Sequence, residues 1–180
     1  MGAISGLVNW RSGVSGSSEL TPVMDELQQS GADGGWTWND QTATLGFQTT
    51  VPAAGEIGFL HHDSESGLTI TADVRIDNRE ELCDKLAIPT GPKMSDTRLV
   101  LRAYQKWGED CPDHLLGDFA FAIWDARRQQ LFAARDLAGV RPFYYYSDDS
   151  RLVFASDLPA VAAAAGMSRQ LNKMYSSGWA

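Results

Sequence analysis

Residues 99–146 read LVLRAYQKWGEDCPDHLLGDFAFAIWDARRQQLFAARDLAGVRPFYYY and carry the clearest secondary-structure pattern of the chain. Its first part has the apolar spacing of a helix that ends at Gly108. Large apolar residues then alternate through 117–125, a turn follows, and a second run returns through 131–135. The PFYYY segment at 142–146 is expected to pair with RLVFAS at 151–156 as two neighbouring strands. The whole pattern predicts a β-meander with one buried face.

The first half of the chain predicts a second group of strands. Residues 3–10 have the composition of a short buried strand, and 17–31 have the spacing of a helix that ends at Gly31. Three strand-like segments follow, separated by turn residues, at 42–50, 55–62 and 67–76. An antiparallel sheet is expected here.

Helices are predicted between the two strand groups and after them, at 77–88, 95–108 and 158–166. Two strand groups with helices between and after them favour an α+β arrangement with layers of helix, sheet, sheet and helix. A chain of 180 residues suits one substantial domain. We assign that domain to residues 1–166 and interpret 167–180 as a tail or as the start of a linker.

Composition excludes several classes of function. The chain carries 15 Lys and Arg against 23 Asp and Glu, and the net charge of -8 opposes binding to a nucleic-acid backbone. No stretch approaches the roughly 20 apolar residues that cross a bilayer, so no membrane contact is expected. The two cysteines, Cys83 and Cys111, are interpreted as buried free thiols, which favours a reducing cytoplasm.

Several short motifs of the second half together resemble a known family. They are Trp107-Gly108, LGDFAFAIWD at 116–125, ARD at 134–136, Arg141-Pro142 and FAS at 154–156. This series is similar to the glutaminase domain of asparagine synthetases, which are class-II (type 2) glutamine amidotransferases. With a weaker first half, the resemblance covers roughly residues 2–172. It implies a four-layer αββα sandwich of the N-terminal nucleophile (Ntn) hydrolase type.

The family's mechanism needs a nucleophile that this chain lacks. In the family, a Cys that becomes the first residue after Met removal attacks the side-chain amide of glutamine, and its own α-amino group is the base. An α-amine has an ordinary pKa of about 7.7–8.0, so it can accept a proton near neutral pH. The matching position here is Gly2, which has no side-chain atom to attack with. No catalytic residue is therefore assigned.

The substrate-binding positions implied by the resemblance differ as well. Thr49 stands where the family has an Arg for the glutamine carboxylate, so the bidentate guanidinium is lost. Asp73, Val74 and Arg75 replace an Asn-Gly-Glu stretch that supplies oxyanion donors and an acid for the substrate amine. Asp96 matches a family acid near that amine and is retained. Whether Phe47 and Arg75 fill this pocket or leave it open is undecided by the sequence.

These changes predict a degenerate amidotransferase domain that serves as a structural and docking partner. Degenerate relatives resemble the leading domains of β-lactam-forming synthetases and of lasso-peptide cyclases, which activate a carboxylate with ATP. The expected partner is an adenylating synthetase domain or subunit, with a peptide or amino acid as its possible substrate. ATP and Mg²⁺ are expected only in that absent synthetase domain, to which 167–180 would lead. No cofactor or metal is assigned to this chain.

Two other functions stay open at this point. One is a residual glutaminase or amidase that uses Ser5 or Cys83 as its nucleophile. The other is a small-ligand binding module in which Arg75 and Asp96 hold a zwitterion or an acid in the former glutamine pocket. The histidines have no carboxylate or Cys cluster at ligand spacing, so structural roles are expected for His61, His62 and His114.

Overall fold

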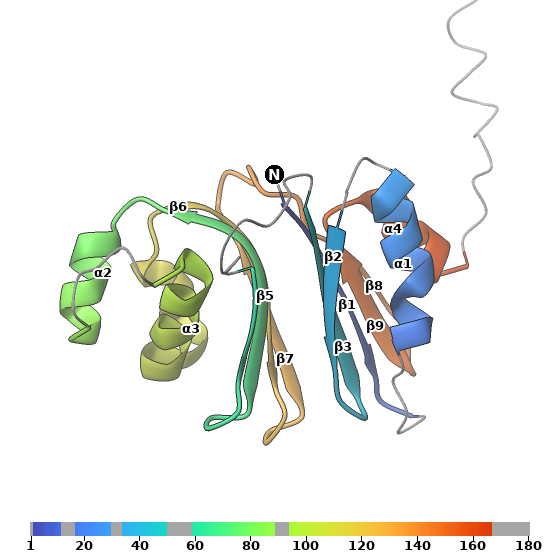
Figure 1. Cartoon of the computed structure of the whole chain (residues 1–180), viewed down its shortest axis with the longest axis horizontal. Coiled ribbons are helices and arrows are strands. Elements are labelled where there is room, and N and C mark those ends of the chain that lie inside the picture. Colours follow the sequence, from blue (N-terminus) through green and yellow to red (C-terminus); the bar gives the residue numbers. More distant parts are fainter. Residues whose placement is uncertain (1, 12–16, 30–33, 50–58, 89–93, 167–180) are drawn as a thin grey trace, which may run out of the picture.

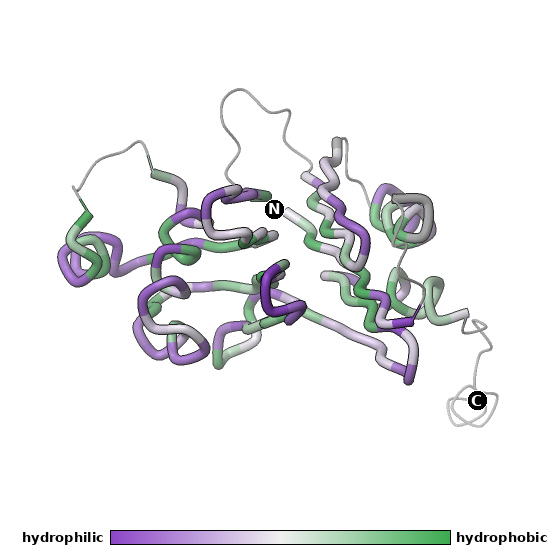
Figure 2. The backbone as a smooth tube through the Cα atoms, turned by 90° about the horizontal axis from the view of Figure 1, so that it is seen from below, coloured by the Kyte–Doolittle hydropathy of each residue, from purple (hydrophilic) through white to green (hydrophobic). Residues whose placement is uncertain are grey.

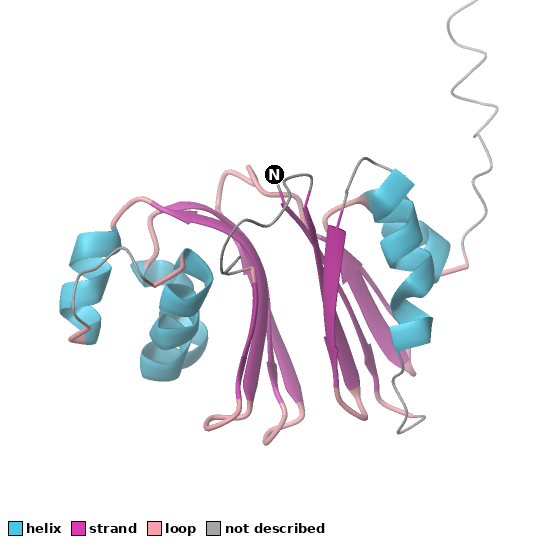
Figure 3. Cartoon of the chain, viewed as in Figure 1, coloured by secondary structure: helices cyan, strands magenta, loops and turns pink. Residues whose placement is uncertain are grey.

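The structure of the chain is a computed structural model that describes residues 2–11, 17–29, 34–49, 59–88 and 94–166. Two β-sheets face each other in the middle of the molecule, and helices cover the outer face of each sheet (Figures 1 and 3). The layer order is thus helix, sheet, sheet, helix. This confirms the predicted four-layer αββα sandwich.

Each sheet is antiparallel and combines strands from distant parts of the sequence. Within the described ranges, the first sheet has the order β2-β3-β1-β9-β8 and the second has the order β4-β5-β6-β7. The strands of the first sheet are β1 (Gly2–Asn9), β2 (Gly34–Asn39), β3 (Ala43–Thr49), β8 (Tyr144–Ser147) and β9 (Arg151–Ala155). Those of the second sheet are β4 (Leu60–Asp63), β5 (Leu68–Ile76), β6 (Gly117–Asp125) and β7 (Gln130–Arg135).

The helices are divided between the two outer layers. Helices α1 (Ser17–Gln29) and α4 (Leu158–Ala164) cover the first sheet, and their apolar residues form one cluster with that sheet's outer face. On the second sheet lie α2 (Arg79–Leu86), α3 (Asp96–Trp107) and the 3-10 helix η1 (Gly108–His114). Hydrophobic residues run through the strands of both sheets, whereas the helices mix both kinds of residue (Figure 2).

Strand β6 is buried on both faces, which corrects the prediction of a meander with one buried face. One face packs against α2 and α3 through Phe119, Phe121 and Ile123. The other packs against the first sheet through Ala120, Ala122 and Trp124. The β8–β9 hairpin, which we expected to continue this meander, belongs to the first sheet instead. The small residues on the inner face of β6 let the two sheets approach each other.

Most predicted elements are confirmed, and one strand was missed. Strand β2 was not predicted, and it pairs with β3 at the edge of the first sheet. Asn78 precedes α2 but makes no side-chain cap; its side chain bonds the backbone of His114 and Leu116 instead. By contrast, Ser95 caps α3 by accepting a hydrogen bond from the backbone N–H of Arg98. The predicted helix end at Gly31 and the segment 167–180 lie outside the described residues.

Among the residues that the structure describes, no helix is both long enough and apolar enough to cross a membrane.

Candidate functional site

The site expected from the sequence lies where β1 begins, at the end of the sandwich marked N in Figure 1. Gly2 pairs with Thr49 of β3 and lies opposite Asp73 of β5, across the space between the two sheets. The backbone N–H of Gly2 donates a hydrogen bond to the Asp73 carboxylate. This position therefore joins the two sheets through a contact between backbone and side chain.

Phe47 occupies the space beside Gly2. An ideal Cβ built on Gly2 would lie 2.4 Å from Cζ and 2.5 Å from Cε2 of the Phe47 ring. That ring is fully buried and stacks on Phe59, with 4.2 Å between centroids and 8° between planes. Cβ contacts below 3.0 Å are essentially never seen, so any side chain at position 2 requires the ring to move.

Asp73 forms an ion pair with Arg141 beside Gly2. The Arg141 Nη1 and Asp73 Oδ2 atoms are 3.1 Å apart, and the two side chains are 18% and 10% exposed. Burial raises the pKa of the Asp73 carboxyl, although the Arg141 charge and the Gly2 N–H act to lower it. The carboxylate is thus already committed to a cation and a backbone donor from this chain.

The loop that carries Arg141 is fixed by Asp136, which directly follows β7. The Asp136 carboxylate accepts hydrogen bonds from the backbone N–H groups of Val140, Arg141 and Phe119, at 2.9, 3.1 and 3.3 Å. Although burial raises its pKa, these bonds hold the pKa of Asp136 below its ordinary value. Gly139 adopts a φ of 66°, which suits the tight turn. Asp136 therefore positions the Arg141 side chain through the backbone of the loop.

Of the other positions singled out by the resemblance, Thr49 lies next to Gly2 as its partner on β3, whereas Val74 and Arg75 lie elsewhere. Thr49 is buried, and the alternation of β3 places it on the same face as Phe47. Val74 is half-buried against the cluster under α2 and α3, on the opposite face of β5 from Asp73. Arg75 is 60% exposed and lies 3.3 Å from carboxylates of both Asp77 and Asp118.

Asp96 has a structural environment at the start of α3. Its carboxylate pairs with the Arg79 guanidinium and accepts a hydrogen bond from the backbone N–H of Ile76 at 2.9 Å. These contacts link α2, α3 and the end of β5. Arg75 and Asp96 are consequently each paired with other charged groups of the chain.

The two alternative nucleophiles lie away from the inter-sheet space. The Ser5 hydroxyl contacts the Met24 Sδ atom of α1 at 3.3 Å, on the helix-facing side of β1. Cys83 belongs to α2 and is buried in the cluster between that helix and the second sheet. The Ser5 hydroxyl thus faces α1, and the Cys83 thiol lies in the packed layer under α2.

The histidines have structural neighbours. His62 stacks on Trp38 and contacts the Thr69 hydroxyl, while His114 stacks on Trp107 with ring centroids 4.0 Å apart. Burial lowers the pKa of His61, and the nearby Arg98 lowers it further. In the part of the chain that the model describes, no group of three His, Cys, Asp or Glu residues could hold a metal ion.

Sequence reasoning missed Arg141 and Asp136 as members of this site. Both belong to motifs that carried the resemblance, yet their role depends on a loop that crosses from one sheet to the other. The open question about the pocket is answered in part: Phe47 lies beside Gly2, whereas Arg75 lies at the surface. The shared face of Phe47 and Thr49 was readable from strand alternation.

Comparisons with known proteins agree with this architecture. A family model described as a glutamine amidotransferase domain matches residues 1–177. Asparagine synthetase [glutamine-hydrolyzing] 3 of Bacillus subtilis is 51% identical over 71 residues, which cover 39% of this chain and 12% of that protein. The Amidase chry2 of Gibberella zeae is 31% identical over 155 residues, which cover 81% of this chain and 22% of that protein.

A solved structure shows the same fold at low sequence identity. The glutamine phosphoribosylpyrophosphate amidotransferase of B. subtilis, complexed with ADP and GMP, aligns with a TM-score of 0.65 and 16% identity. The alignment covers 91% of this chain and 43% of that one. The chain spans only 12% and 22% of the two curated relatives named above. By the family model and the fold, this chain belongs to the class-II glutamine amidotransferase domain family and is homologous to asparagine synthetases.

Proposed function

We propose that this asparagine synthetase-like domain does not hydrolyse glutamine and instead serves as a structural and docking domain for an ATP-dependent amide-forming enzyme. The observation that carries the proposal is the contact between Gly2 and Phe47. The residue at the family's nucleophile position has no side chain, and a buried aromatic ring fills the space that a side chain would need. The enzyme served would be an adenylating synthetase or a macrolactam cyclase.

Charge placement supports the loss of glutamine binding. Glutamine offers an ammonium and a carboxylate at its α-carbon, so its pocket needs an anion and a cation that are free to pair with it. Asp73 is paired with Arg141 at 3.1 Å, and Arg75 and Asp96 are paired elsewhere. Thr49 offers no charge at the position where the family has its Arg. The charges that glutamine would need are therefore already paired within the chain.

An apolar surface near Gly2 supports a docking role. Large apolar side chains are exposed at several strand ends on the Gly2 side of the sandwich, and four of them lie along the β7–β8 loop and the starts of β8 and α4. We call these four the apolar rim: Leu137, Val140, Tyr144 and Leu158. The β7–β8 loop carries the first two, and the others lie at the starts of β8 and α4. Exposed apolar surface commonly marks protein contacts where it forms a contiguous patch.

The proposed partner is the adenylating synthetase domain or subunit. The curated relatives named above extend far beyond the matched region, which leaves most of their length for other chemistry. ATP and Mg²⁺ would be bound by that partner, together with its amino-acid or peptide substrate. The buried free thiols Cys83 and Cys111 are compatible with our placement of this assembly in the cytoplasm.

The docking role is tested by reconstitution with a separately purified adenylating partner. Sedimentation should show a complex of this chain with the partner, and the partner's ATP–pyrophosphate exchange should be more stable to heat in the complex. The double variant Leu137→Asp/Val140→Asp should weaken the complex at least tenfold. Trp10→Asp is the matched control, because Trp10 is a similarly exposed apolar residue at the far end of β1. Equal weakening by both variants, or no complex with the unmodified chain, would contradict the proposal.

A further inference from the structure

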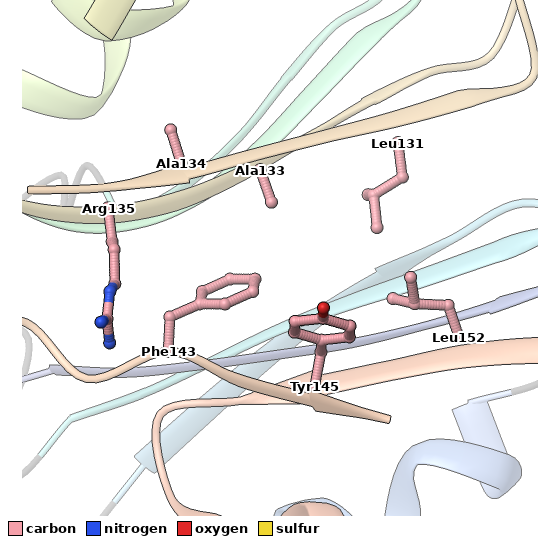
Figure 4. Close-up of a pocket in the computed structure, with 7 residues that line it drawn as sticks. All are labelled: Leu131, Ala133, Ala134, Arg135, Phe143, Tyr145 and Leu152. Carbon is pink, nitrogen blue, oxygen red and sulfur yellow. The ribbon is translucent and has the colours of Figure 1, made fainter. Parts of the chain in front are cut away.

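A groove opens between the two sheets on the side where β7 and β8 form their edges. It has a volume of about 510 Å³. Residues from β7 lie on one side of the groove, and residues from the β8–β9 region lie on the other (Figure 4). The lining consists of Leu131, Ala133, Ala134, Arg135, Phe143, Tyr145 and Leu152. This volume lies within the range of pockets that bind small molecules, about 300–1,000 Å³.

Strand alternation explains the apolar character of the groove. Phe132 and Ala134 pack against the cluster under α2 and α3, so Leu131, Ala133 and Arg135 face the first sheet. Their neighbours across the gap include Phe143, whose ring stacks on Phe154 with 5.1 Å between centroids. The small Ala133 side chain leaves the space between the sheet edges unfilled (Figure 4). The groove therefore lies where the edge strands β7 and β8 do not close over the core between the sheets.

Arg135 places one positive charge at an end of this apolar groove. Its guanidinium points into the gap (Figure 4). The adjacent Asp136 accepts hydrogen bonds from backbone N–H groups. Across the described portions of the chain, no carboxylate lies within ion-pair distance of Arg135. An ideal Cβ on Gly139 would lie 3.5 Å from the Arg135 Cζ atom, so the guanidinium rests close to this loop.

We propose that the groove binds an amphipathic monocarboxylate. Its hydrocarbon part would lie between Ala133 and Tyr145, where burial of apolar surface favours binding. Its carboxylate would accept two parallel hydrogen bonds from Arg135, the geometry for which a guanidinium is suited. The pairing of a lone cation with an apolar wall selects this ligand over a neutral hydrocarbon or a cation. The site is separate from the contact between Gly2 and Phe47 and does not depend on the proposed docking role.

Octanoate is a suitable probe, and its binding to the full chain is measured by titration calorimetry. We expect saturable binding with one octanoate per chain and shifts of the Leu131, Ala133 and Leu152 methyl resonances in NMR spectra. Arg135→Gln should weaken octanoate binding about tenfold or more, the effect of losing a charge-assisted pair. The same variant should leave binding of octan-1-ol unchanged, because the alcohol lacks the charge.

Two further variants separate the groove from nonspecific binding. Ala133→Phe should abolish octanoate binding by filling the gap, and the exposed position of Ala133 lets the fold tolerate the larger ring. Arg102→Gln is the matched control, because Arg102 is exposed on α3 and contacts Gln105, beyond the outer face of the second sheet. Octanoate binding that persists in Ala133→Phe, that is equally weakened by Arg102→Gln, or that is absent from the unmodified chain would overturn the proposal.

Discussion

The Phe47 ring occupies the position into which a side chain on residue 2 would project. The ring's Cζ atom lies 2.4 Å from an ideal Cβ on Gly2, and Phe59 stacks on the same ring with 4.2 Å between centroids. A glycine at position 2 and a phenylalanine at position 47 thus depend on each other. Residue 2 stands at the family's nucleophile position, so this contact is the observation behind our proposal that the domain does not hydrolyse glutamine.

This dependence predicts a strong coupling between positions 2 and 47. Gly2→Ala should lower the free energy of unfolding by about 1–3 kcal/mol, because an added methyl group overpacks the space beside the ring. The same substitution should cost much less in a Phe47→Leu background, where the ring is gone. Urea unfolding of the four proteins gives the coupling energy. Additive effects of the two changes would show that the ring does not limit the space.

The Asp73–Arg141 pair predicts a specific effect of Arg141→Met. Removing the cation leaves a buried carboxylate without its partner, which should lower the free energy of unfolding by about 3 kcal/mol at pH 7. Arg75→Met is the matched control and should cost less than about 1 kcal/mol, because Arg75 is 60% exposed. Equal losses in the two variants would contradict the burial of this pair.

The raised pKa of Asp73 determines how the stability effect of Arg141→Met depends on pH. The folded-state pKa of Asp73 lies above its ordinary value of 3.8, so its contribution to stability is full below that pH. The contribution is lost as pH rises through the folded-state pKa. Arg141→Met removes an attraction that lowers this pKa, so the loss should shift to higher pH. Carbon-13 NMR titration of the Asp73 carboxyl measures the shift, and an unchanged or lower pKa would contradict the pairing.

For Asp136 we predict the opposite pH dependence of the free energy of unfolding. Its folded-state pKa lies below 3.8, so its contribution is present above that pH and is lost as pH falls through the folded-state value. Asp136→Asn removes the charge that three backbone N–H groups share and should lower the free energy of unfolding by about 2 kcal/mol at pH 7. The difference from the unmodified protein should shrink as the pH approaches the folded-state pKa. A difference that stays constant with pH would contradict the role of the charge.

The cysteines should be unreactive in the folded protein. Cys111 is fully buried, and burial raises the pKa of its thiol to about 12, which leaves almost no thiolate at neutral pH. Cys83 is 5% exposed within the cluster under α2. We expect negligible reaction of either thiol with Ellman's reagent in buffer and reaction of both after denaturation. Rapid labelling of Cys83 in the folded state would reopen its assignment as a nucleophile.

The fold was predictable because its strands and helices carry strong local patterns. The alternation in β6 and the helical spacing in α3 are long and regular, and both elements form as predicted. Strand β2 was missed because it is six residues long, begins with two glycines and lies at a sheet edge. The placement of the β8–β9 hairpin was also missed, because a hairpin's pattern does not say which sheet it joins.

The sequence predicted those features of the candidate site that one position or one strand determines, but it did not predict contacts between distant segments. The resemblance identified Gly2, and strand alternation could place Phe47 and Thr49 on one face. Arg141 was missed because it reaches Asp73 from a loop between the sheets, and no sequence period encodes that contact. Arg75 has an equally suggestive charge, yet it lies at the surface beside Asp77 and Asp118. The two arginines carry the same charge, so the sequence did not show which one lies in the site. Arg141 reaches Asp73 because its loop runs from the second sheet to the first.

Release of ammonia from glutamine measures whether this domain hydrolyses glutamine. The purified chain, Gly2→Cys and Gly2→Cys/Phe47→Ala would be assayed side by side, with mass spectrometry to verify removal of Met1. We predict no ammonia above background from the unmodified chain, because it lacks a nucleophile beside Asp73. Gly2→Cys alone should also be silent, because Phe47 fills the space beside the new side chain. Ammonia release by the unmodified chain in proportion to its concentration would contradict the account.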